Sequence, residues 1–368
     1  MILYLTVAAA TLLLAYMVNN QPVLQPYKLT RQQMCNGVCL TAIFIILFAL
    51  SALRQSVGND YGRYIEFMHL AYYDAYVPTE AGFNLLSKFV YALSGFENYL
   101  LVFAIFSFFT VFLFMLAIYE QSDEFPMTFF LFMALGYYFQ TFNTVRYYLA
   151  LALALYSMKF VIRKQWFKFI LLVFLGSLFH KSMLIVLPLF FLASLAWKKW
   201  QLALAGLFCI TFLFFQDFYL KVVLFLYPTY EDTEYLEGGT SYINILRCVA
   251  VLALSLFYYR KSIKDNRRLR FFFYLNLGAL ALYVFCSFLP IISRIGYYLT
   301  ISHILFLPAL LKETENEKLR RFLKIGMILA ALFYFAMFMG KAYNDNMRIL
   351  PYRSFLFEDR VDTTWIGD

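Results

Sequence analysis

Residues 98–118 read NYLLVFAIFSFFTVFLFMLAI, an unbroken apolar stretch without a charged side chain. A helix rises about 1.5 Å per residue, so a stretch of this length spans about 30 Å, the thickness of a bilayer's hydrocarbon core. Closed β-barrels also span bilayers, but a continuous run of Leu, Phe and Ala lacks the alternation of barrel strands. The stretch therefore predicts a transmembrane helix.

Similar runs recur along the whole chain. Hydrophobic residues make up 63% of it and charged residues 14%, whereas a soluble domain has about 45–50% and about 25%. We predict an all-α, polytopic transmembrane helical bundle of about twelve spans. The expected spans are residues 1–18, 35–53, 98–118, 127–143, 147–162, 166–180, 182–196, 201–215, 242–259, 271–290, 296–311 and 322–340.

These spans predict a single transmembrane domain, residues 1–340, followed by an outer C-terminal tail, residues 341–368. Two outer loops are expected at residues 54–98 and 216–241. The first loop should carry amphipathic helices that lie in the membrane interface, because several of its apolar residues fall on one helical face. These residues are Phe83, Leu86, Val90 and Leu93.

The distribution of basic residues predicts the orientation. With both termini outside, most of the 31 Lys and Arg residues fall on the inner side, as in most membrane proteins. A basic inner face beside anionic lipid also accounts for the net charge of +9, so no nucleic-acid partner is expected. The five cysteines form no metal-binding pattern, and the sequence has no Gly-rich phosphate loop, so we predict neither a metal site nor a cofactor.

Ionisable residues gather in four connections that this topology places on the outer side. Such residues at the membrane are costly and are functional candidates when they face a cavity. Because the arms on either side of His180 and Lys181 are short, we expect that turn to be recessed within a cationic, outward-open pocket. The connections are LRQSVGNDYGRYIEF (53–67), FNTVRYY (142–148), FHKS (179–182) and SRIGYY (293–298).

Structural roles are the alternative for several of these residues. Arg54 directly follows an apolar run, so its long side chain could simply reach the interface. Asp60 could cap the helix that follows it, and His180 could be satisfied by backbone groups at a span end.

The order of the motifs resembles the EpsG family of Wzy-type polysaccharide polymerases. The first motif has the form R-x-x-x-G-x-D-Y-x-x-Y and runs from Arg54 to Tyr64. The others are E-x-G-F from Glu80, an arginine that opens a span at Arg146, F-H-x-S from Phe179, and a late element of the R-x-x-Y-Y type from Arg294.

The resemblance implies a membrane glycosyltransferase that polymerises lipid-linked repeat units into O-antigen, capsule or exopolysaccharide. The donor would be an undecaprenyl pyrophosphate-linked oligosaccharide and the acceptor another lipid-linked repeat unit. The reaction would take place at the outer, periplasmic face of the bacterial cytoplasmic (inner) membrane. Beside the lipid bilayer, a chain-length regulator and a flippase are candidate partners.

Residue roles follow from the chemistry of that transfer. Negative charge builds on the departing pyrophosphate, and guanidinium groups stabilise such charge well. We assign that role to Arg54, Arg146 and Arg294, with Arg63 as a further candidate. The acceptor hydroxyl needs a base, for which Asp60 is the first candidate and His180 the second.

Three residues are expected to bind the sugar. Tyr61 and Tyr298 would suit stacking on sugar rings, and Glu80 would position the sugar or support the loop. Because arginines replace the charge-neutralising role of a cation, we predict a metal-independent enzyme. An O-antigen ligase, a lipid-linked oligosaccharide flippase or transporter, and a membrane O-acyltransferase with His180 as base remain the alternatives.

Overall fold

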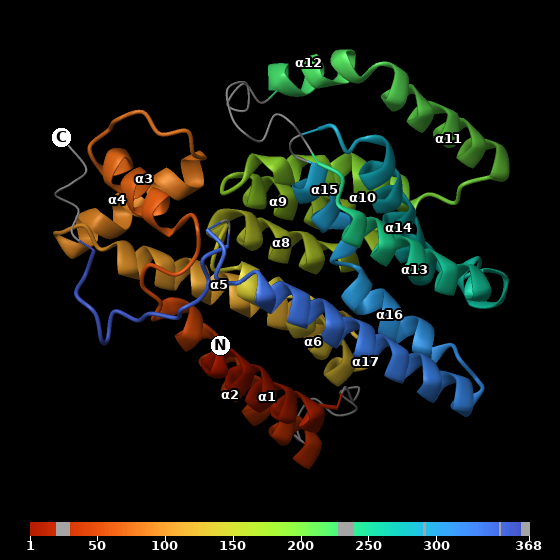
Figure 1. Cartoon of the computed structure of the whole chain (residues 1–368), viewed down its shortest axis with the longest axis horizontal. Helices are drawn as coiled ribbons and strands as arrows, with labels where there is room; N and C mark the ends of the chain where they lie inside the picture. The colour runs from red at the N-terminus through yellow and green to blue at the C-terminus, as the bar shows by residue number, and fades with distance from the viewer. Residues whose placement is uncertain (20–29, 227–238, 290–291, 346, 362–368) are drawn as a thin grey trace. The chain divides into compact units, whose positions relative to one another are not determined.

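The computed structural model describes residues 1–19, 30–226, 239–289, 292–345 and 347–361 (Figure 1). Within these ranges every named element is a helix, and the extended backbone contributes one isolated bridge, between Arg54 and Ser354. The predicted all-α class is therefore confirmed for the described part of the chain.

Seven helical segments of the described residues are long and apolar enough to cross a membrane. They are α2 (Arg31–Ala52), α5 (Tyr99–Gln121), α8 (Val145–Ile162), α13 with the turn after it (Tyr242–Ile263), α14 (Arg267–Phe285), α15 and α16 together (Ile292–Lys312), and α17 (Glu317–Gly340). An eighth span is formed if α11 (Lys199–Phe214) and α12 (Gln216–Leu226), bent by 88° at their junction, count as one.

The predicted number of twelve spans is not confirmed. Each predicted segment overlaps a helix, but four helices are too short for a full crossing at about 1.5 Å per residue. The short helices are α1 (Ile2–Met17), α6 (Phe125–Ala134), α9 (Trp166–Ser177) and α10 (Val186–Ser194). Apolar composition alone does not set helix length: the segment predicted at 127–143 breaks at Gly136, whose φ of +77° ends α6 before α7 (Tyr137–Gln140).

The chain divides into two compact units. Unit 1 comprises Met1–Tyr156, Leu175–Lys181 and Thr314–Asp368, and unit 2 comprises Ser157–Phe174 and Ser182–Glu313. The domain boundary predicted at residue 340 remains a prediction, and the described part of the C-terminal tail belongs to unit 1.

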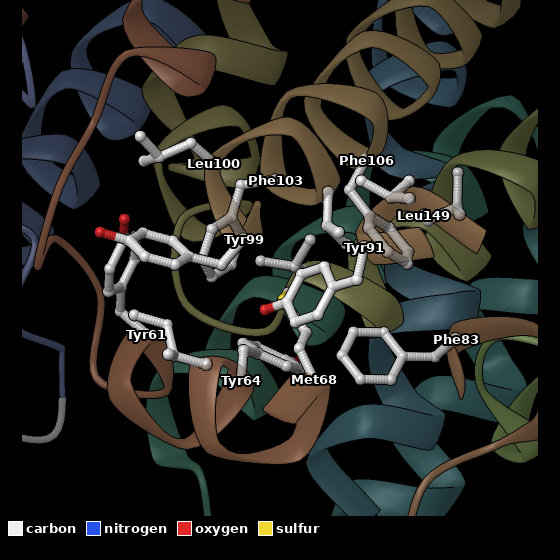
Figure 2. Close-up of a cluster of buried hydrophobic side chains, with 14 residues drawn as sticks. Tyr61, Tyr64, Met68, Phe83, Tyr91, Tyr99, Leu100, Phe103, Phe106 and Leu149 are labelled. Atoms are coloured by element: carbon white, nitrogen blue, oxygen red, sulfur yellow. The ribbon is translucent and has the colours of Figure 1, made fainter. Parts of the chain in front are cut away.

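The core of unit 1 is largely aromatic. Helices α3 (Tyr61–Tyr72) and α4 (Ala81–Ser94) pack on each other, and α4 also packs on α5. Figure 2 shows Tyr64 and Met68 of α3 near Phe83 and Tyr91 of α4, and Tyr61 at the other end of the cluster beside Tyr99 and Phe103 of α5.

Helix α4 differs in one respect from the expected apolar face. Phe83 and Val90 are buried, but Leu93 is 73% exposed and lies with Leu85 and Phe89 on an outer apolar stripe. Leu93 follows Phe83 by ten positions, which is not a whole number of turns at about 3.6 residues per turn, so its side chain points away from the core.

The loop predicted at residues 216–241 is partly helical, because residues 216–226 form α12. Residues 227–238 of that loop lie outside the described part of the chain.

Helix α14 is the centre of unit 2, where it packs against α10, α13 and α15. Its Asn276 amide donates to the carbonyl of Cys248 on α13 at 3.1 Å, and its Oδ1 lies 2.9 Å from Nε2 of the buried His303 on α16. Polar side chains of this kind join helices in membranes, where apolar surfaces alone give little preference for protein over lipid.

Candidate functional site

The loop from Arg54 to Asp60 is held against the turn that precedes α8. Gly58 has a φ of +102°, and a Cβ at this position would collide with the carbonyl of Phe142. The backbone N–H of Asn59 donates to Oδ1 of Asn143 at 2.8 Å. The glycine of the first motif therefore permits this close approach, which the spacing of the motif does not reveal.

The C-terminal strap, residues 348–361, holds the same loop from another direction. Its carbonyls accept from the backbone N–H groups of the loop: Gln55 donates to Arg353 at 3.0 Å and Gly58 to Arg348 at 2.9 Å. In return, Phe355 donates to the carbonyl of Leu53 at 3.3 Å. The loop is thus ordered partly by residues some 300 positions further along the chain.

Arg54 is the first residue of this loop, and it is only 1% exposed. Its Nη1 donates to the carbonyl and the hydroxyl of Ser51, and its guanidinium lies 5.2 Å from the ring centres of both Phe103 and Phe142. Burial lowers the pKa of the Arg54 guanidinium. In the described part of the chain no carboxylate pairs with it, and Nε and Nη2 have no hydrogen-bond partner.

Glu80 joins three segments of unit 1. It precedes α4, one carboxylate oxygen pairs with Nη1 of Arg146 at the start of α8, and the other accepts from the backbone N–H of Lys181 at 2.9 Å. The side chains of Glu80 and Arg146 are 15% and 14% exposed, so this ion pair is largely shielded from solvent. Removing either partner would leave a poorly hydrated charge.

The motif E-x-G-F now has a physical explanation. Glu80 makes the ion pair, while the N–H of Gly82 donates to the carbonyl of Leu178 at 2.8 Å. A Cβ at Gly82 would lie 2.6 Å from that carbonyl oxygen, so the position requires glycine. The ring of Phe83 supports the Arg146 guanidinium at 5.3 Å from its centre.

Tyr64 lies beside this pair and one helical turn after Asp60. Its ring centre lies 5.6 Å from the Arg146 guanidinium, and its hydroxyl hydrogen-bonds to Arg146. The negative charge of Asp60 also acts on this hydroxyl. Burial raises the pKa of Tyr64, and the positive charge of Arg146 opposes this rise. Asp60 itself is half-buried at the start of α3 and makes no side-chain capping bond, in contrast to the capping role considered from the sequence.

The other motif residues of unit 1 have diverse surroundings. The His180 ring stands nearly perpendicular to that of Tyr147, with ring centres 5.4 Å apart. Tyr61 is buried and stacks on Phe103 at 4.5 Å, so its ring is part of the core. The side chain of Arg63 on α3 is exposed.

Unit 2 contains the remaining predicted residues, on α15 (Ile292–Thr300). Tyr298 is fully buried and its hydroxyl lies 3.0 Å from that of Ser182, the last residue of the motif F-H-x-S. Gly296 is required because a Cβ there would collide with the ring of Tyr283. Arg294 is half-buried and lies one helical turn before Tyr298.

The structure thus brings Asp60, Tyr64, Glu80 and Arg146 together, with Lys181 contributing its backbone N–H. Sequence reasoning missed the Glu80–Arg146 pair, since the partners are 66 residues apart and no local spacing reports it. It also missed Asn143 and Tyr64 as supporting residues. The described residues contain no group of three or more His, Cys, Asp or Glu arranged to hold a metal ion.

The described residues form helices, and seven helical segments are long and apolar enough to cross a membrane, as in a multi-pass membrane protein. A model of the EpsG family matches residues 37–354, and the chain therefore belongs to this family of Wzy-like polysaccharide polymerases. The resemblance noted in the motifs is confirmed, and membership makes the chain a membrane polysaccharide polymerase. No curated protein and no solved structure matches it.

Proposed function

We propose that the protein transfers a growing glycan from its undecaprenyl pyrophosphate carrier onto a new lipid-linked repeat unit at the outer face of the bacterial cytoplasmic membrane. The observation that supports this most directly is the shielded Glu80–Arg146 pair close to Asp60. Arg146 would supply an oriented cation and Asp60 a carboxylate base, the two groups that such a transfer needs.

In the proposed reaction the acceptor hydroxyl oxygen forms a bond to the anomeric carbon of the growing glycan. The bond from that carbon to the pyrophosphate oxygen breaks, and its electron pair stays on the departing pyrophosphate. Asp60 takes the proton of the acceptor hydroxyl. His180 is the second candidate for this role.

Arg146 would stabilise the charge that builds on the pyrophosphate. Glu80 engages Nη1 and holds the guanidinium plane, and a guanidinium has five N–H donors in all. The Arg146 guanidinium is therefore already oriented before the reaction, and it does not need to reorient when the charge develops on the pyrophosphate. Glu80 is thus proposed to position Arg146, a role that differs from the positioning of the sugar or support of the loop expected from the sequence.

Arg54 is proposed to act through the loop. At 1% exposure between two phenylalanine rings, its guanidinium stabilises the segment that carries Asp60 and does not itself reach a substrate. Arg294 and Arg63 retain the substrate-binding roles predicted from the sequence as proposals. Tyr61 and Tyr298 were also predicted to bind the sugar, but their rings are buried, so we propose instead that they support the site by packing. Metal independence is likewise a proposal.

The test is reconstitution of the purified full-length protein with lipid-linked repeat units. The proposal expects a ladder of products, release of undecaprenyl pyrophosphate and unchanged activity in a metal chelator. A single addition to a different acceptor would indicate a ligase, and movement of the lipid across the bilayer without new glycosidic bonds would indicate a flippase. Loss of activity in chelator with recovery on addition of a divalent cation would contradict metal independence.

A further inference from the structure

Unit 2 contains a large apolar cavity between α11 and the helices α10, α13 and α14. Its volume is about 990 Å³, and it extends along α11 from Trp200 to Phe212. Side chains such as Leu204, Phe208 and Leu282 form its walls. It is large enough for hydrocarbon chains, since drug-sized ligands occupy pockets of about 300–1,000 Å³.

Three of the polar side chains in the cavity wall are already hydrogen-bonded within the protein. Trp197 donates from its indole N–H to the carbonyl of Leu192 at 2.8 Å, and Oε1 of Gln201 accepts from the N–H of Lys198 at 2.8 Å. The hydroxyl of Tyr274 is engaged by Tyr259 and by the backbone of Trp197. A polar ligand that enters the cavity would therefore lose hydrogen bonds to water and gain few from the protein. A hydrocarbon chain has no such hydrogen bonds to lose.

One end of the cavity is basic and aromatic. Trp197, Trp200 and Tyr274 line this end, where α11 packs on α14. Arg270 lies one helical turn before Tyr274 on α14. Lys198 and Lys199 at this end are exposed, and no carboxylate of the described residues pairs with them. Tryptophan and tyrosine next to lysine and arginine are typical of the membrane interface.

We propose that this cavity binds an anionic glycerophospholipid of the bilayer, with its acyl chains against α11 and α14 and its phosphate beside Lys198, Lys199 and Arg270. Basic pockets between transmembrane helices bind anionic headgroups in this way. On the predicted topology Lys198 lies at the inner surface and Arg146 at the outer one. The occupant is therefore distinct from the lipid-linked donor, whose pyrophosphate is proposed to bind at Arg146.

Native mass spectrometry of the full-length protein after equilibration with phosphatidylglycerol or phosphatidylcholine vesicles tests the proposal. We expect about tenfold greater retention of phosphatidylglycerol, since each lysine near an anionic headgroup adds appreciable attraction. The Lys198→Gln/Lys199→Gln variant should lose this preference. Equal retention of the two lipids by the unaltered protein would overturn the proposal.

The Gly206→Phe variant fills the cavity directly, because a Cβ at Gly206 meets open space. It should lose both lipids, and undiminished retention of phosphatidylglycerol would overturn the proposal. The matched control is Arg163→Gln/Lys164→Asn, two exposed basic residues of unit 2 outside the cavity wall, which should keep the preference. Asparagine suits the φ of +59° at Lys164.

A third arm adds undecaprenyl phosphate as a competitor. The proposal expects it to leave the phosphatidylglycerol in place. Displacement that is absent in the Gly206→Phe variant would instead assign the cavity to the polyprenyl carrier and overturn the phospholipid assignment. Because the readout is retention of lipid, its outcome is independent of polymerase activity.

Discussion

Glu80 and Arg146 form an ion pair across 66 residues of sequence, and the second carboxylate oxygen of Glu80 binds the backbone of Lys181. Three motifs that are separate in the chain therefore meet at one carboxylate. Because the pair is shielded from solvent, its charges are screened less than those of a surface pair. This arrangement supports the proposed role of Arg146 in binding the leaving group.

Replacing Arg146 with alanine should lower kcat about 100- to 1,000-fold, the usual cost of losing one positioned electrostatic donor. Glu80→Gln should have a smaller effect, because the amide oxygen can still accept from Lys181 or from Arg146. Initial rates of glycan polymerisation in proteoliposomes measure both. Lys88→Ala is the control, since its pair with Asp74 also involves α4 but is largely exposed, and it should leave the rate unchanged. Full activity of Arg146→Ala would refute the proposed site.

Gly82→Ala should destabilise unit 1 by about 1–3 kcal/mol, because the new methyl group would press on the carbonyl of Leu178. Gly62→Ala is the matched control: its Cβ meets open space in α3, so the helix should gain up to about 1 kcal/mol. Thermal unfolding in detergent, followed by circular dichroism, compares the two. Equal midpoints would show that the approach of α4 to Leu178 is less tight than the structure indicates.

Asp60→Asn should lower kcat about 100- to 10,000-fold with little change in KM, because the amide cannot accept the acceptor's proton. The acid limb of the pH–rate profile should disappear in the same variant. His180→Gln should retain that limb and lose less activity. The reverse pattern, with the limb retained in Asp60→Asn and lost in His180→Gln, would make His180 the base.

Deleting the residues from 348 onwards should loosen the loop that carries Asp60, because the backbone bonds from Gln55 to Arg353 and from Gly58 to Arg348 are lost. Hydrogen exchange at residues 53–60 should rise, and the polymerisation rate should fall. A chain that lacks only residues 363–368 keeps these bonds and serves as the control. Unchanged exchange in the longer deletion would show that the loop is ordered without the strap.

The predicted orientation can be tested by cysteine labelling in intact cells. Lys181 and Lys198 are both exposed in the structure, so a cysteine at either position is reachable and the difference reports the side of the membrane. A membrane-impermeant maleimide should label Lys181→Cys and leave Lys198→Cys unlabelled. Labelling of only Lys198→Cys would show that the orientation in the membrane is the opposite of the predicted one.

The sequence by itself determined that the protein lies in a lipid bilayer and that its fold is all-α. Apolar runs such as residues 98–118 specify membrane helices because a bilayer offers no partners to backbone polar groups, so each run must satisfy its own. The motifs also indicated the family, which the match over residues 37–354 confirms.

The sequence did not determine which runs cross completely, because helix breaks depend on single residues such as Gly136 within otherwise apolar stretches. Nor did it determine the partners of the charged residues. Arg146 lacked a partner nearby in sequence, and Arg54 resembled an interfacial side chain, yet one pairs with Glu80 and the other is buried between two phenylalanines. Such pairings arise between residues far apart in sequence, and only the packing of α3, α4 and α5 with the start of α8 brings them together.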